Sequence, residues 1–167
     1  NIAENLMIVD VLRNDISRVS KKGSVEVTEL AKIKSYKNVH HLVSTIKGSL
    51  SEKLDAIDLL FATLPGGSIT GAPKIRAMEI ISELEKNRRG VYCGAIGFIS
   101  FSKDSDFNIP IRTLTIADDT ISINCGGGIV SDSNAESEYQ ESIDKNENIL
   151  KEKRKKIIKQ SSNVNQK

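Results

Sequence analysis

The stretch Pro65-Gly-Gly-Ser-Ile-Thr-Gly-Ala-Pro-Lys74 runs directly into a helical pattern of apolar residues at Ile75–Leu84. Glycine lets a backbone adopt positive φ and approach a ligand closely, so this loop is suited to contact a bound group. We predict that Thr70 caps the helix and that Pro73 lies in its first turn. The loop then presents free N–H groups and the positive end of a helix dipole, which together favour an anion.

The loop superficially resembles a nucleotide-binding P-loop, because Gly66 and Gly71 have the spacing of that motif. The residues that follow exclude this interpretation. Ala72-Pro73-Lys74 stands where the motif requires Lys followed by Ser or Thr. The predicted anion is therefore not a nucleotide phosphate bound in the P-loop manner.

The bulk composition is that of an ordinary globular domain. A length of 167 residues is enough for one domain with a hydrophobic core. The shares of hydrophobic residues, 38%, and charged residues, 28%, are typical of soluble globular proteins. The net charge is +2, but residues 151–159 hold six positive charges and one negative, so the rest of the chain sums to 2 − 5 = −3. We interpret this basic run as a solvated helix end, and we expect no nucleic-acid partner.

The sequence also bears on the compartment. The two cysteines, Cys93 and Cys125, lack the spacing of metal ligands, which fits a reducing cytoplasm. The apolar stretches are too short to span a bilayer and no secretory signal is visible, so we expect a cytoplasmic protein without a membrane partner. Because the chain opens without Met and without a lead-in to its first helical pattern, we expect it to be cut from a longer protein.

Periodicity predicts an α+β fold in which helices come first, antiparallel strands follow and a helix closes the chain. We expect no internal repeat and no domain boundary within residues 1–159, and a disordered tail at 160–167. The predicted helices are 3–13, 38–47 capped by Asn38, a segment comprising Ser51 and 54–64, 74–86, and one from Ser133 to about Lys159 that opens with a Ser133–Glu136 capping box. The predicted strands are 25–28, 90–102, 109–117 and 120–125, with turns at Lys21–Ser24 and Asp118-Asp119.

Two carboxylates near the start of the last helix form a candidate metal site. Glu138 and Glu141 stand three residues apart, so they share one helix face. Like charges this close are costly unless a cation lies between them, and Mg²⁺ takes one or two carboxylates together with waters and substrate oxygens. The alternative is a solvent-exposed acidic turn that the helix dipole favours.

Other residues point to the binding of anions. Arg112 lies in the apolar run Ile109–Ile116, so it needs an anion partner, either a carboxylate such as Asp106 or a ligand. Gly126–Gly128 offers bare backbone amides at the end of a strand, and Tyr92 supplies a hydroxyl. A small substrate with two carboxylates would fit this set.

His41 is the candidate for acid–base chemistry near neutral pH. It stands beside His40 on a predicted helix, where only one of the two can face inward. A single buried histidine is also a common structural feature, so that alternative stays open.

Many separated motifs resemble the C-terminal part of the chorismate-binding enzymes, a family that includes the anthranilate synthases and the aminodeoxychorismate synthases. The resemblance covers about residues 3–150. It rests on Ala3–Asp10 with Leu12–Asp15, Val39–Ser44, Pro65–Lys74, Tyr92–Gly97, Ile111–Thr113, Gly126–Val130 and Ser137–Glu141, all in the expected order. The Gly-Gly-Ser version of the loop is closer to the aminodeoxychorismate synthase members.

The resemblance implies a role for individual residues. Glu4 and Glu141 resemble the Mg²⁺ ligands, and Glu138 resembles the residue that holds metal-bound water. His41 and Ser68 resemble groups beside the substrate ring. The groups that resemble binders of the chorismate carboxylates are Tyr92, Arg112 and the amides of Gly126, Gly127 and Gly128.

The resemblance also implies the fold and the reaction. The family fold is a layered β-sandwich with antiparallel strands and flanking helices, of which this chain supplies a part. The implied reaction is amination of chorismate at C4 to 4-amino-4-deoxychorismate in folate biosynthesis, with ammonia from a glutamine amidotransferase subunit. The alternatives are amination at C2 with loss of pyruvate, as in the anthranilate synthases, and a non-catalytic fragment or basic-tailed binding module.

Two features depart from the family pattern. The family's Pro-Ile-Lys-Gly-Thr segment, whose lysine attacks the ring in aminodeoxychorismate synthases, does not occur in residues 1–167. We therefore expect these residues alone to be inactive. Asn1 stands where the family has an acidic residue, and this affects the expected surroundings of the metal.

Overall fold

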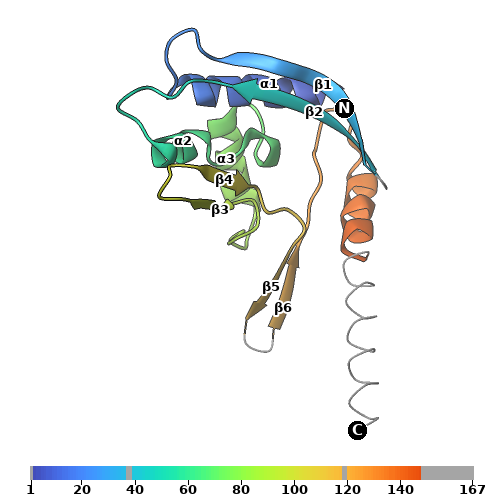
Figure 1. The fold of residues 1–167 in the computed structure, drawn as a ribbon. Coiled ribbons are helices and arrows are strands. Elements are labelled where there is room, and N and C mark those ends of the chain that lie inside the picture. Colours follow the sequence, from blue (N-terminus) through green and yellow to red (C-terminus); the bar gives the residue numbers. More distant parts are fainter. Residues whose placement is uncertain (1, 37–38, 118–119, 148–167) are drawn as a thin grey trace. The chain divides into compact units, whose positions relative to one another are not determined.

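The structure is a computed structural model that describes residues 2–36, 39–117 and 120–147. The chain divides into two compact units, Asn1–Ile109 and Pro110–Lys167. Figure 1 shows the helices and strands of each unit, and the two units are described separately. The predicted tail at 160–167, the helix beyond residue 147, and the turn at Asp118-Asp119 lie outside the described residues.

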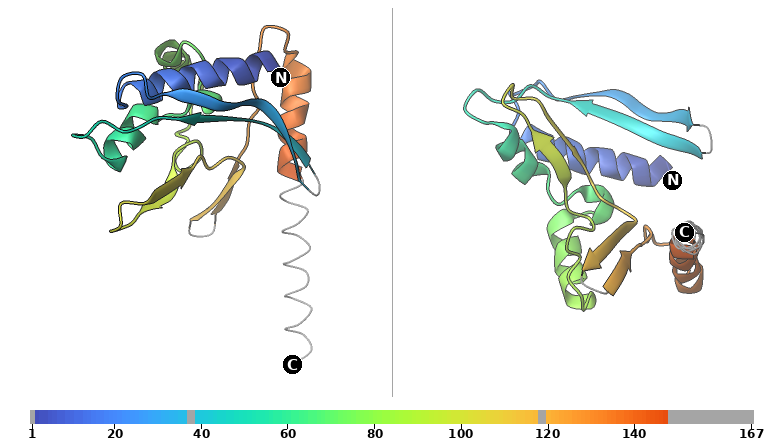
Figure 2. Two further views of the ribbon diagram at one scale, coloured as in Figure 1. Left: turned by 45° about the horizontal axis from the view of Figure 1, so that its top comes forward. Right: turned by 60° about the horizontal axis from the view of Figure 1, so that its bottom comes forward.

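The first unit begins with helix α1, Ile2–Ser17, which confirms the helix predicted at 3–13 and extends it at both ends. The helix lies along a hairpin of two long strands, β1 (Glu26–Tyr36) and β2 (Val39–Lys47), as the views in Figure 2 show. The predicted turn before β1 is confirmed, with Gly23 at φ 77°. Strand β1 is longer than the predicted strand at 25–28 because β2 pairs with it along most of its length.

The helix predicted at 38–47 is wrong, since this segment is strand β2. Val39 pairs with Tyr36 and Lys47 pairs with Glu26, so β2 is antiparallel to β1. β-Branched residues favour strands, and here the partner strand decides the outcome for a short apolar run whose period is ambiguous. Asn38, the predicted cap, lies outside the described residues.

A bulge in β1 ties the hairpin to α1. The pairing register shifts between Glu29 and Lys32, and Ala31 has φ 48°. The Ala31 N–H donates to Ser44 Oγ at 2.9 Å, and the Ser44 hydroxyl donates to Asn5 Oδ1 of α1 at 2.6 Å. A bulge leaves one amide without a ladder partner, and this chain of hydrogen bonds satisfies it.

The same bulge carries an ionic cluster around Glu29. Lys34 and Lys32 approach its carboxylate at 2.8 and 3.0 Å, and Thr45 donates to it at 3.0 Å. These hydrogen bonds, the one from Lys34 first, lower the pKa of Glu29 to about 2. The carboxylate therefore stays charged over the whole physiological pH range.

Helix α2, Ala56–Thr63, begins later than the predicted segment at Ser51 and 54–64. The cause is a capping box at Asp55, whose side chain accepts from the amides of Ile57 and Asp58 at 2.8 and 3.2 Å. Asp58 accepts from the Asp55 amide in return at 2.8 Å. These reciprocal bonds fix the start of the helix.

The glycine loop forms a short 3₁₀ helix, η1 (Gly67–Ile69), and leads into helix α3 (Lys74–Leu84), which confirms the helix predicted at 74–86. The predicted roles of Thr70 and Pro73 are wrong. Pro73 is the N-cap residue and makes no side-chain cap, whereas the Thr70 hydroxyl donates to the Gly66 carbonyl at 2.9 Å inside the loop. The loop closes on itself before the helix begins.

Close packing explains two of the loop glycines. A Cβ at Gly67 would lie 2.6 Å from Cγ1 of Val11 on α1, and one at Gly66 would lie 2.6 Å from Cδ1 of Ile109. Of the loop glycines, only Gly71 has positive φ, at 140°. The glycines at 66 and 67 thus let the loop press against its own unit.

A buried ion pair joins α3 to α1. Asp15 is 3% exposed, and the Lys74 ammonium at the first residue of α3 contacts its carboxylate at 2.5 Å. Lys74 also lies 3.5 Å from the Thr63 carbonyl at the end of α2. One side chain therefore meets three helices at the exit of the glycine loop.

The strand predicted at 90–102 is mostly wrong, because residues 90–95 form turns and only β3, Ile96–Ile99, is extended. The turns bring the Tyr92 amide to the Arg89 carbonyl at 3.2 Å, and Cys93 has φ 64°. Strand β3 pairs with β4, Ser105–Asn108, in an antiparallel hairpin. Glycines at 90 and 94 favour this tight winding over a strand.

The second unit contains the predicted hairpin, since β5 (Thr113–Ala117) pairs antiparallel with β6 (Thr120–Asn124). The first strand begins at Thr113 and not at the predicted Ile109. A helix over residues 135–147 follows. The predicted Ser133–Glu136 capping box is wrong, because Asn134 Oδ1 accepts the amides of Glu136 and Ser137 at 3.1 and 3.2 Å.

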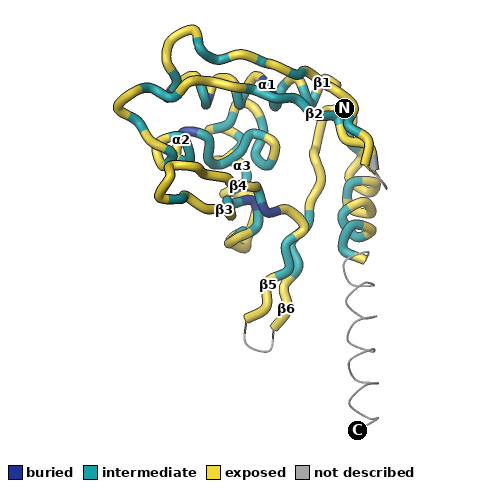
Figure 3. Tube along the Cα trace, in the orientation of Figure 1, coloured by how far each residue is buried: buried dark blue, intermediate teal, exposed yellow. Residues whose placement is uncertain are grey.

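The α+β class with antiparallel strands is confirmed, and the described strands form three two-stranded sheets. Figure 3 shows how little of the chain is buried. The buried hydrophobic residues among those described are Val9, Val19, Ala62 and Cys93, all in the first unit. No helix in the described ranges is long and apolar enough to cross a membrane.

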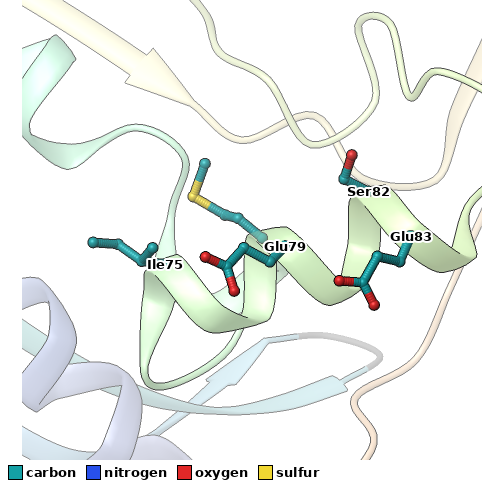
Figure 4. Close-up of a pocket in the computed structure, with 5 residues that line it drawn as sticks. Ile75, Glu79, Ser82 and Glu83 are labelled. Atoms are coloured by element: carbon teal, nitrogen blue, oxygen red, sulfur yellow. The ribbon is translucent and has the colours of Figure 1, made fainter.

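Helix α3 leaves an apolar face uncovered. A shallow hollow of about 480 Å³ runs along it, and Figure 4 shows the side chains that line it. The lining residues are Ile75, Met78, Glu79, Ser82 and Glu83. They come from one helix and include none of the predicted site residues, so this hollow is a helix face and not an active-site cleft.

We predict that Lys74→Met destabilises the protein strongly, by about 3–5 kcal/mol, because it leaves the Asp15 charge buried without a partner. The double variant Asp15→Leu/Lys74→Met removes both charges and should recover much of this loss. Urea denaturation measures the free energy of unfolding. The control is Arg13→Ala, which breaks an exposed pair with Asp10 and should cost less than about 1 kcal/mol; a similar cost for both single variants would contradict the prediction.

Candidate functional site

Glu4, a predicted metal ligand, lies half-buried in the first turn of α1. The next residue, Asn5, accepts the hydrogen bond from Ser44 that closes the bulge network. This bond fixes the start of α1 against the middle of β2. The carboxylate of Glu4 is therefore carried on a helix end that is held in place and not frayed.

His41 lies on a strand and not on the predicted helix. Successive side chains of a strand point to opposite faces, so His40 and His41 diverge. The His41 ring is exposed and meets Tyr36 edge-on, with ring centroids 5.7 Å apart and planes at 71°. Ser44, which contacts α1, is three residues away and therefore on the other face of the hairpin from His41.

Ser68 lies in η1, where its side chain is exposed. The loop around it is closed by local bonds, from the Ile69 amide to the Gly66 carbonyl at 3.2 Å and from the Thr70 hydroxyl to the same carbonyl at 2.9 Å. The hydroxyl of Ser68 is thus presented outward from a tightly folded loop.

Tyr92 lies half-buried in the turns before β3. The guanidinium carbon of Arg89 lies 6.0 Å from the centroid of its ring, at the limit of a cation–π contact. Arg89 also donates to the Ile69 carbonyl at 2.8 Å. One arginine therefore connects the glycine loop to Tyr92.

Arg112 lies just before β5 and is exposed, not inside a strand as predicted. It has no ion-pair partner among the described residues, and the two partners that the sequence leaves open, a carboxylate such as Asp106 or a ligand, stay predictions. Its φ of 51° places it in the left-handed region, which costs a non-glycine residue roughly 1–2 kcal/mol. Such conformations cluster at ligand sites, and this one presents an exposed guanidinium.

In the second unit the glycine run meets the acidic helix. A Cβ at Gly127 would lie 3.1 Å from Glu138 Oε2. Ser133 donates to the other carboxylate oxygen of Glu138 at 2.6 Å, and Oε2 is buried without a hydrogen-bond partner. The fold thus places a glycine, and no side chain, directly against a carboxylate oxygen whose hydrogen-bonding capacity is unused.

Lys145 joins the same cluster, and sequence analysis did not identify it. Its ammonium forms an ion pair with Glu141 Oε1 at 2.5 Å and donates to the Gly126 carbonyl at 3.3 Å. It lies one turn after Glu141 on the helix, and this spacing is the signal that could have found it. The cluster of Gly126, Gly127, Glu138, Glu141 and Lys145 therefore holds both carboxylates and a cation beside a bare backbone.

This cluster partly fits a hard cation. The orphan oxygen of Glu138 can accept from a metal-bound water, and Glu141 keeps one oxygen outside its ion pair. The described residues contain no group of three or more His, Cys, Asp or Glu side chains that could hold a metal. A complete metal shell would thus need ligands beyond this cluster, such as a substrate carboxylate.

The predicted site residues fall into two sets. Within the first unit, Arg89 links the loop of Ser68 to Tyr92. Within the second unit, the glycine run and the acidic helix are in contact. The catalytic, substrate-binding and metal-binding roles given to these residues stay predictions.

Comparison with known proteins gives a consistent result. The sequence model of the chorismate binding enzymes matches residues 1–151. Aminodeoxychorismate synthase component 1 of Escherichia coli (strain K12) is 59% identical over 150 residues, which is 90% of this chain and 33% of that protein. Anthranilate synthase component 1 of Aquifex aeolicus is 49% identical over 149 residues, 89% of this chain and 30% of that protein.

A solved structure agrees with the sequence comparison. The crystal structure of anthranilate synthase component I from Streptococcus pneumoniae matches with a TM-score of 0.78 at 49% identity, covering 86% of this chain and 33% of that one. The chain thus spans about a third of the length of the relatives it matches.

We predict that Ser133→Ala lowers the free energy of unfolding by about 1–3 kcal/mol, because it leaves both oxygens of a half-buried carboxylate without a hydrogen bond. Guanidinium chloride denaturation measures the change. Ser131→Ala is the matched control, since Ser131 is exposed and only approaches Asp132 at 3.4 Å. Indistinguishable values for the two variants would show that Glu138 does not depend on Ser133.

Proposed function

The chain belongs to the chorismate-binding enzymes, and on that premise we propose that the protein containing it aminates chorismate at C4 to give 4-amino-4-deoxychorismate. Ammonia comes from a glutamine amidotransferase subunit, and the reaction serves folate biosynthesis in the cytoplasm. The observation that carries the proposal is the cluster in which Gly127, Glu138, Glu141 and Lys145 meet. Such a cluster suits a small dianion bound together with a cation.

The carboxylates of chorismate have candidate partners in this chain. Arg112 offers a guanidinium without a protein carboxylate among the described residues, and a guanidinium binds a carboxylate through two parallel hydrogen bonds. The amides of Gly126–Gly128 and the hydroxyl of Tyr92 add neutral donors. Lys145 supplies a second cation if its pair with Glu141 rearranges on binding.

Glu141 and Glu4 are the proposed Mg²⁺ ligands, and Glu138 would hold a metal-bound water. The buried, unpartnered Oε2 of Glu138 supports this assignment. A bound Mg²⁺ would supply positive charge that offsets a substrate carboxylate and the charge that develops as the C4 hydroxyl leaves. Glu138 and Glu141 share one helix face, where Lys145 already offsets part of their repulsion, and a metal ion would compensate the remaining negative charge.

The overall reaction consumes one ammonia and releases one water. A C–N bond forms at C4, the C–O bond to the hydroxyl breaks, and the hydroxyl leaves as water after gaining a proton. His41 is the proposed donor of that proton because imidazole changes charge near neutral pH. Ser68 is proposed to lie beside the ring and to orient the leaving group by a hydrogen bond.

The second candidate is amination at C2 with loss of pyruvate, as in anthranilate synthase component I. A relative and a solved structure of that name, each 49% identical to this chain, support this candidate. The higher identity to aminodeoxychorismate synthases and the Gly-Gly-Ser version of the loop favour C4. A third candidate is a binding module that uses the basic run at 151–159, which lies outside the described residues.

We expect the full-length protein, given chorismate, Mg²⁺ and ammonium, to form a product that a separate aminodeoxychorismate lyase converts to para-aminobenzoate. Chromatography with mass detection distinguishes this product from anthranilate, which needs no second enzyme. Formation of anthranilate would replace C4 with C2 amination. Absence of any chorismate binding would overturn both enzyme assignments, and salt-sensitive binding of nucleic acid in that case would support the basic module.

We predict that Glu141→Gln weakens Mg²⁺ binding by the full-length protein at least tenfold, because a carboxylate ligand of a hard cation is lost. Titration calorimetry with Mg²⁺ in the absence of substrate measures this without relying on turnover. Glu136→Gln is the matched control, since Glu136 lies on the same helix with an exposed side chain outside the cluster. Equal Mg²⁺ affinity in both variants would exclude Glu141 as a ligand.

A further inference from the structure

Arg89 joins two segments that are 20 residues apart. Its Nη1 donates to the carbonyl of Ile69, the last residue of η1, at 2.8 Å. Its Nε and Nη2 donate to the two carboxylate oxygens of Glu85 at 2.8 and 2.6 Å. Glu85, the C-cap residue of α3, therefore binds the guanidinium through two hydrogen bonds, while Nη1 of the same guanidinium donates to the glycine loop.

The same residue holds Tyr92 in two ways. The guanidinium carbon lies 6.0 Å from the ring centroid, and the Arg89 carbonyl accepts the Tyr92 amide at 3.2 Å. The hydrogen bonds between Arg89 and Glu85 lower the pKa of the glutamate and raise that of the arginine, so the pair stays charged. The guanidinium of Arg89 thus lies near the ring of Tyr92 and donates to the carbonyl of Ile69 at the same time.

Arg76 shows what an ordinary ion pair on this helix looks like. It binds Glu79 at 2.8 Å and Glu83 at 3.7 Å, all three on α3, and its side chain is 59% exposed. The side chain of Arg89, which lies in the segment after α3, is 25% exposed and bonds to a main-chain carbonyl in the glycine loop. Burial and this long-range bond mark Arg89 as a connecting residue and not as a solvated charge.

We propose that Arg89 is a positioning residue that fixes the glycine loop, and with it Ser68, relative to Tyr92 for the binding of the substrate. This inference rests on the proposed function, because Ser68 and Tyr92 are substrate-facing only there. The other hydrogen bonds that close the loop, at Gly66 and Thr70, are local, so the bond from Arg89 to Ile69 is the one that connects the loop to the segment of Tyr92.

Lysine cannot replace arginine in this position. The guanidinium uses three N–H groups in a plane, two toward Glu85 and one toward Ile69, while its face lies near Tyr92. An ammonium is a point charge on a flexible stem, and it cannot keep the fork and the third bond together. Arg89→Lys therefore keeps the charge but loses the connection.

The test compares Arg89→Lys with Arg76→Lys in the full-length protein. We expect Arg89→Lys to lower kcat/KM for chorismate about a hundredfold, mainly through KM, since a misplacement of about 1 Å has effects of that order. Arg76→Lys should change it by less than about threefold, because that pair is exposed. Similar losses in the two variants would overturn the proposal.

Hydrogen exchange supplies a readout that does not depend on turnover. In Arg89→Lys, the amides of Ile69, Thr70 and Tyr92 should exchange at least tenfold faster, while those in the middle of α1 keep their protection. If wild type binds no chorismate, the proposed function fails, but faster exchange confined to both segments still supports the connection through Arg89. Unchanged exchange at Ile69 and Tyr92 would overturn it in either case.

A second variant covers the case in which Arg89→Lys does not fold. Glu85→Gln keeps Arg89 but removes the charge that orients its fork, so it should raise exchange at Ile69 and Tyr92 to a smaller extent. Glu79→Gln, which loosens only Arg76, is its control. Exchange that rises equally in the two glutamate variants, or in neither, would contradict the proposal.

Discussion

The buried ion pair between Asp15 and Lys74 is the contact on which the first unit depends. Asp15 is among the least exposed residues described, and a buried carboxylate is tolerated only when a cation and hydrogen bonds compensate it. The pair joins the last turn of α1 to the first residue of α3, and it therefore sets where the glycine loop must end. Few hydrophobic residues are buried, so this ion pair is a main contact that holds α1 and α3 together.

The glycine loop is shaped from both sides by this constraint. Val11 of α1 leaves no room for a side chain at Gly67, and Arg89, in the segment after α3, donates to the carbonyl of Ile69. The loop is thus a packed element that presents Ser68, and its glycines serve packing as much as ligand approach. A glycine also serves close packing in the second unit, where the absence of a side chain at Gly127 lets the segment after β6 approach Glu138.

The exposed apolar face of α3 is a further consequence of the small core. Ile75 and Met78, one turn apart on this helix, are 75% and 41% exposed although both are large hydrophobic residues. Apolar surface of this kind usually marks an interface with another part of a protein or with a partner. The relatives that the chain matches are about three times as long, so they contain enough additional chain to cover such a face.

The sequence by itself determined the α+β class, α1, the loop-to-helix unit at Pro65–Leu84, and the final hairpin, because their periodicity and turn residues are local signals. It also predicted the two glycine runs and the acidic pair as parts of one binding site; the structure brings Gly127 and Glu138 together within the second unit, and the single site stays a prediction. Tertiary structure alone decided that 39–47 is a strand, because pairing with β1 outweighs an ambiguous apolar run. It alone joined Arg89 to Ile69 and Lys145 to Gly126, since contacts across 20 and 19 residues are invisible to local periodicity, although the i,i+4 spacing to Glu85 and Glu141 is a local signal.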